Sequence, residues 1–112
     1  MNRLLADAPY SSEAFGRRAV VDESHLLLMQ IALLPGQEVP LHKANSNVHV
    51  IVLEGEMEIV LDGVAQKAES GDLVPVAYQT PMRIFNGSET GTTFLVVKTP
   101  HPREIEEKGN SG

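Results

Sequence analysis

The chain has 112 residues, of which 42% are hydrophobic and 21% are charged, a balance that suits one globular domain with one core. Its formal net charge of −6 argues against a nucleic-acid-binding protein, which needs a basic surface, and against docking on an anionic membrane. The absence of cysteine excludes disulfides, a thiolate nucleophile and a cysteine-based zinc site.

The first residues, MNRLLADAPYSSE, hold one arginine, a very short apolar patch and then Asp7. This is not the pattern of a secretory signal, and no apolar run approaches the roughly 20 residues that span a bilayer. We therefore expect a cytoplasmic protein whose residues 1–16 form an N-terminal arm.

The following residues predict short strands separated by turns. Residues 17–21 and 25–34 are the first two strands, and Pro35-Gly36 ends the second. Residues 48–53 form a β-branched run, and residues 56–62 alternate polar and apolar with a period of two. Asp62-Gly63 is a hairpin signal that leads to a returning strand, because glycine accepts the positive φ of such a turn. The remaining predicted strands are residues 64–69, 73–76, 82–85 and 92–98.

Short strands at regular spacing are typical of an all-β sandwich or barrel, closed or nearly closed. We expect a single domain over residues 1–112, with the barrel at residues 17–100 and a tail at residues 101–112. One helical turn is expected at residues 104–108, followed by a frayed end.

Two stretches make the fold more specific. PGQEVPLHKA with VHVIVLEGE, followed by LDGVAQKAESGDLVPVAYQTPMRIFN, resembles the two motifs of the cupin superfamily. Gly36 and Gly55 match the glycines of the first motif, and Gly71 and Asn86 match the glycine and asparagine of the second. The phrases VLEGE, SGDLV and LVVKTPHP are also similar to those of small single-domain cupins. The resemblance covers about residues 26–100 and implies a cupin-type double-stranded β-helix, a jelly-roll barrel.

In metal-binding cupins, three histidines and a glutamate hold a divalent metal inside the barrel. By the resemblance, His42 stands at the first histidine position, while Ala44, Val48 and Met82 stand at the other three. Alanine and valine bind no ion, and methionine is a soft ligand suited chiefly to Cu(I). The motif is therefore expected to be degenerate, with no metal cofactor.

His49 lies one residue past the glutamate position. Side chains alternate along a strand, so Val48, Val50 and Val52 should share one face and His49 the other. A bulge near residues 45–47 would reverse this parity and bring His49 into the pocket. We expect His49 to face away and the pocket to be lined by His42, Ala44, Val48, Val50, Tyr78 and Met82.

Three functions fit this pattern. The first is a non-metal cupin that binds a small, largely apolar or mildly polar molecule, or a regulatory or structural module. The second is a metal-dependent dioxygenase or isomerase that uses an atypical set of His42, His49 and Met82. The third is a metal-free acid/base enzyme of the epimerase kind, with His42 and Tyr78 as the nominated groups and no carboxylate partner evident beside them.

The resemblance also implies a homodimer, since small cupins commonly pair by exchanging N-terminal strands. Unpaired sheet edges give a physical motive for this pairing. Residues 17–21 are the candidate for the exchanged strand. Light scattering is expected to give the mass of a dimer at micromolar concentration, and a monomer there would contradict the prediction.

Overall fold

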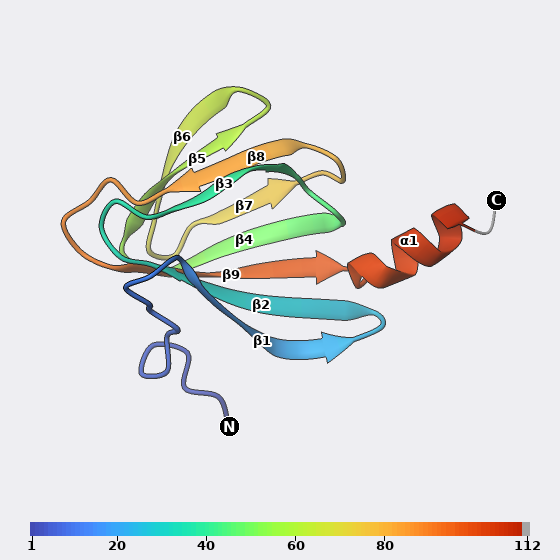
Figure 1. Cartoon of the computed structure of the whole chain (residues 1–112), viewed down its shortest axis with the longest axis horizontal. Helices are drawn as coiled ribbons and strands as arrows, with labels where there is room; N and C mark the ends of the chain where they lie inside the picture. The colour runs from blue at the N-terminus through green and yellow to red at the C-terminus, as the bar shows by residue number, and fades with distance from the viewer. Residues whose placement is uncertain (111–112) are drawn as a thin grey trace.

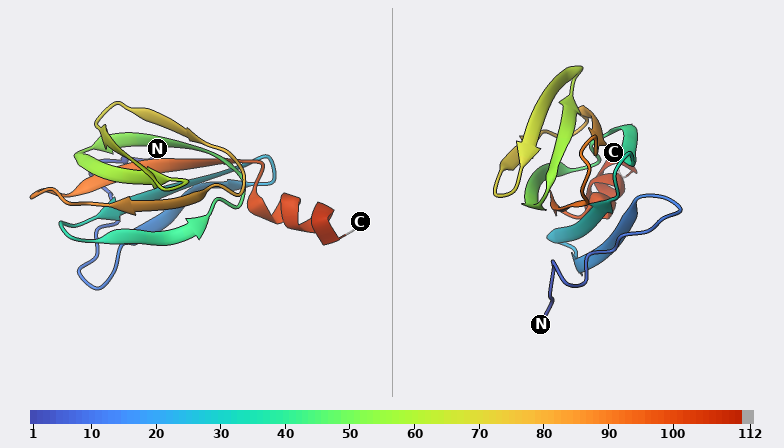
Figure 2. Two further views of the ribbon diagram at one scale, coloured as in Figure 1. Left: turned by 90° about the horizontal axis from the view of Figure 1, so that it is seen from above. Right: turned by 90° about the vertical axis from the view of Figure 1, so that its left-hand side faces the viewer.

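The computed structural model describes the backbone of residues 1–110 and the side chains of residues 1–106. Within this part of the chain, nine strands form two sheets and one helix follows them (Figure 1). The expected all-β fold is confirmed. Figure 2 shows the two layers from two further directions, with the helix projecting beyond the ends of the strands.

The first sheet has five strands in the order β1-β2-β9-β4-β7. Their bounds are β1 Gly16–Glu23, β2 Leu26–Leu33, β9 Thr92–Thr99, β4 Asn47–Glu54 and β7 Leu73–Val76. The second sheet has four strands in the order β3-β8-β5-β6. These are β3 Glu38–Lys43, β8 Pro81–Phe85, β5 Glu56–Leu61 and β6 Val64–Glu69. All strand pairs are antiparallel.

The core lies between the sheets and is built mostly from aliphatic side chains. Along β4, Val48, Val50 and Val52 are buried to 2% exposure or less, while His49 between them is exposed. The predicted parity of this strand is therefore confirmed. Phe94 of β9 and Ile59 of β5 pack into the same core from the two sheets.

Strand β3 was not among the expected strands, and its sequence explains why. A β-bulge interrupts its pairing with β8 between Val39 and His42. A bulge breaks the alternation of polar and apolar residues, and Pro40 within it has no backbone N–H for the ladder. Neither feature is typical of a regular strand.

Strand β1 lies at an edge of the five-stranded sheet and pairs with β2 of the same chain. Within residues 1–110 it has a strand neighbour on one side only, so its second edge is available for pairing. The strand-exchanged homodimer stays a prediction.

The C-terminal helix α1, Pro102–Asn110, is longer than the single turn expected at residues 104–108. Proline suits a first turn because its missing N–H has no partner there. The His101 Nδ1 accepts a hydrogen bond from the Arg103 N–H at 3.1 Å, as a capping side chain does. The frayed end was expected at residues 110–112, but Asn110 is the last residue of α1, and residues 111–112 lie outside the described residues. Across residues 1–110, no helix has the length and apolar character needed to cross a bilayer.

Candidate ligand-binding site

A cavity of about 310 Å³ lies between the inner faces of the two sheets. Its walls are mainly apolar. The five-stranded sheet contributes Met29, Ile31, Val48 and Val96, and the four-stranded sheet contributes Val39, Met82 and Ile84. Phe15, from the end of the N-terminal arm, lies beside them. An apolar concavity with a few polar groups is the general form of a small-molecule site.

The bulge in β3 sets the orientation of His42. In an uninterrupted strand, the residue on the same face as the buried Val39 would be Leu41. One extra residue in the bulge shifts the register, so that His42 pairs with Met82 and lines the cavity. Leu41 also lines it and is 68% exposed, and His42 is exposed as well, so both residues lie at the rim. Bulges next to functional sites commonly re-aim side chains in this way.

His42 is held by a local hydrogen bond. Its Nδ1 lies 2.9 Å from the Pro40 carbonyl oxygen. A carbonyl oxygen can only accept, so Nδ1 carries the hydrogen and donates it. The Nε2 atom is therefore left as the nitrogen that a ligand can meet, as an acceptor when the ring is neutral.

Two cationic side chains also line the cavity, and neither was predicted from the sequence. Arg17 of β1 and Lys98 of β9 both line it. Lys98 could have been found, because it has the same parity in β9 as the buried Phe94 and Val96. The placement of Arg17 depends on its long-range pairing with Ile31 of β2, which no local pattern reveals.

Three of the six expected pocket residues lie elsewhere. Val50 is fully buried in the core, one pleat deeper than Val48. Ala44 forms two backbone hydrogen bonds with the loop before β8, donating to Thr80 at 3.0 Å and accepting from Gln79 at 2.8 Å. These bonds hold Ala44 beside Tyr78 in a separate, open depression. His42, Val48 and Met82 line the cavity.

The residues around the cavity do not fit a divalent metal. His49 lies on the outer face of β4, so the set of His42, His49 and Met82 is not brought together. Among the side chains of residues 1–106, no group of three His, Cys, Asp or Glu could hold a metal ion. One histidine and one thioether are a poor donor set for Fe, Mn or Zn, which take three or more protein ligands.

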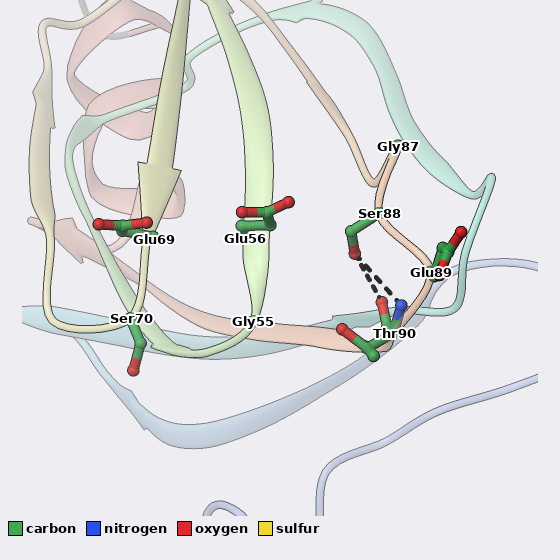
Figure 3. Close-up of a pocket in the computed structure, with 8 residues that line it drawn as sticks. All are labelled: Gly55, Glu56, Glu69, Ser70, Gly87, Ser88, Glu89 and Thr90. Atoms are coloured by element: carbon green, nitrogen blue, oxygen red, sulfur yellow. Dashed lines mark hydrogen bonds between the residues drawn. The ribbon is translucent and has the colours of Figure 1, made fainter.

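A larger open depression, of about 650 Å³, has a different character. Three glutamates line it together with glycine, serine and threonine residues. Figure 3 shows Glu56 on β5 and Glu69 on β6 well apart from Glu89 on the loop after β8. The Glu56 carboxylate lies 3.0 Å from the Lys67 ammonium, an exposed ion pair. The described residues that line this depression form no apolar wall and include no histidine, so the cavity beside His42 is the better candidate site.

No protein-family model matches the sequence. The chain is 34% identical over 87 residues to an uncharacterized protein of Methanocaldococcus jannaschii, covering 77% of this chain and 75% of that protein. The crystal structure of the same archaeal protein is described as an RmlC-like cupin family protein with a double-stranded β-helix fold. It aligns with a TM-score of 0.77 and 30% identity over 87% of this chain and 92% of that one. An RmlC-like cupin protein from Desulfovibrio desulfuricans aligns with a TM-score of 0.80 and 26% identity, covering 89% and 95% of the two chains.

Proposed function

The chain belongs to the RmlC-like cupin family, and from that premise we propose that it is a non-metal cupin whose barrel cavity around His42 binds a small, largely apolar molecule. The main support for the proposal is the composition of the cavity wall. Apolar side chains from both sheets form most of it, and His42, which is exposed, lies at its edge. Its volume of about 310 Å³ is at the lower end of the range, roughly 300–1,000 Å³, of small-molecule sites.

The metal-dependent dioxygenase or isomerase is the alternative. It needs a third strong ligand besides His42 and Met82, and His49 faces away from both. The available metal ligands therefore favour a cupin that binds no metal. The acid/base enzyme needs a second catalytic group beside His42. Tyr78 is a poor candidate for it, because Tyr78 lines a different depression.

The test is an NMR titration with benzyl alcohol, a small neutral probe with an apolar ring. We expect amide shifts confined to the residues of the cavity, with a Kd on the order of 1 mM for so small a ligand. Ile31→Trp fills the cavity, because Ile31 lines it, and should weaken binding at least about tenfold.

Ile51→Trp is the matched control. Ile51 has a similar intermediate exposure and lies on the outer face of β4, away from the cavity. Its variant should bind the probe like the parent protein. The absence of cavity shifts in the parent protein would overturn the proposal. So would stoichiometric Fe, Mn, Cu, Ni or Zn in untagged protein that disappears in His42→Ala.

A further inference from the structure

Among residues 1–106, no aspartate or glutamate lines the cavity, so its two cations have no acidic partner there within this part of the chain. Among the described side chains, Arg17 forms neither an ion pair nor a hydrogen bond that would occupy its guanidinium. Two other arginines differ in this respect: Arg18 donates to the Gln30 side chain, and Arg83 pairs with Glu38. The cavity of an acidic protein therefore carries a local positive charge.

The charges of Arg17 and Lys98 act on each other. Burial lowers the pKa of the Lys98 ammonium below its ordinary value, and the positive charge of Arg17 lowers it further. Both effects disfavour a cation at this place in the free protein. A bound anion between the two groups would oppose the effect of Arg17 on the Lys98 pKa, because opposite charges stabilise each other.

We propose that the natural ligand is a small monocarboxylate, whose apolar body occupies the cavity and whose carboxylate binds Arg17 and Lys98. This rests on the proposed small-molecule function of the same cavity. The planar guanidinium of arginine donates two parallel hydrogen bonds that match a carboxylate. Arg17 on β1 and Lys98 on β9 lie on the two strands that flank β2 in one sheet, and both side chains line the cavity.

A carboxylate suits the site better than a phosphate. A phosphate monoester carries close to two negative charges and three strong acceptor oxygens. Apart from the two cations, His42 and Asn45 are the polar side chains that line the cavity, and most of the wall is apolar. Removing a dianion from water into such a wall would be expensive, whereas one carboxylate leaves a single charge for the two cations.

The experiment compares benzoate with benzyl alcohol, which have the same ring and differ in charge. Benzoate should bind at least about tenfold more tightly, because it adds charge-assisted hydrogen bonds. Raising the salt concentration should weaken the binding of benzoate and leave the binding of benzyl alcohol unchanged. Arg17→Gln and Lys98→Gln should each lower the benzoate affinity by about fivefold or more and should reduce the ratio of the benzoate affinity to the benzyl alcohol affinity.

Arg103→Gln is the control, because Arg103 is exposed on α1 and its loss changes the net charge by the same amount. It should bind benzoate like the parent protein, and circular dichroism should show that all three variants remain folded. If benzyl alcohol binds and benzoate binds no better, the monocarboxylate assignment is overturned while the proposed function stands. Tighter binding of phenyl phosphate than of benzoate would also overturn it. If benzyl alcohol does not bind in the cavity, the proposed function itself is wrong, whether or not benzoate binds.

Discussion

Gly55→Ala is expected to lower the free energy of unfolding by about 4 kcal/mol, a large fraction of the stability of a domain of this size. Gly55 joins β4 to β5 with φ of +90°, a conformation that residues with a side chain rarely adopt. A Cβ here would lie 2.6 Å from the Gly91 carbonyl oxygen and 2.9 Å from the Thr92 Cα. These are backbone atoms, so the alanine methyl could be accommodated only by moving β9. Chemical denaturation measures the change, and Tm should fall on the order of 15 °C.

Gly63→Ala is the matched control for this prediction. Gly63 also has a positive φ, +81°, but nothing lies within 4 Å of the position of its Cβ. Its replacement should therefore destabilise by only about 1 kcal/mol, from backbone strain alone. Equal effects at the two glycines would mean that the close approach of Gly55 to β9 does not matter for stability.

Asn86→Ala should destabilise the protein by about 3 kcal/mol. The Asn86 side chain is fully buried. Its Nδ2 donates to the carbonyl oxygens of Leu33 and Thr90, each at 2.9 Å. Its Oδ1 accepts from the Ser88 N–H at 3.0 Å and from the Ser88 hydroxyl at 2.7 Å. Alanine would leave the buried Leu33 carbonyl without this donor and would open a cavity beside it.

Urea denaturation of Asn86→Ala, with Asn2→Ala as the control, tests this prediction. Asn2 is exposed in the N-terminal arm, so its replacement should change the stability by less than about 0.5 kcal/mol. A loss below about 1 kcal/mol at Asn86 would contradict the structural role assigned here to the asparagine of the second motif.

The strands with regular patterns could be predicted from the sequence. The hairpin between β5 and β6 has a glycine turn, β5 begins with alternating polar and apolar residues, and β4 has valines at every second position. The outward direction of His49 follows from the same alternation. Gly55 and Asn86 could be identified from the resemblance, although their contacts could not.

The residues that line the cavity could be predicted only in part from the sequence, because the cavity depends on pairing between distant residues. The bulge at Pro40-Leu41 is visible only in the register of β3 against β8. The hydrogen bonds that hold Ala44 and Tyr78 away from the cavity come from the loop before β8. Arg17 reaches the cavity because β1 pairs with β2 in one particular register. Local patterns contain none of this information.

A crystal structure of untagged protein grown with benzoate tests the central claim most directly. It should show the ring between Val48 and Met82, with the carboxylate directed at Arg17 and Lys98, the groups that line the cavity. His42 Nε2 should have no metal bound. An anomalous signal from a transition metal at about 2.0–2.1 Å from His42 Nε2, with no benzoate in the cavity, would contradict the account.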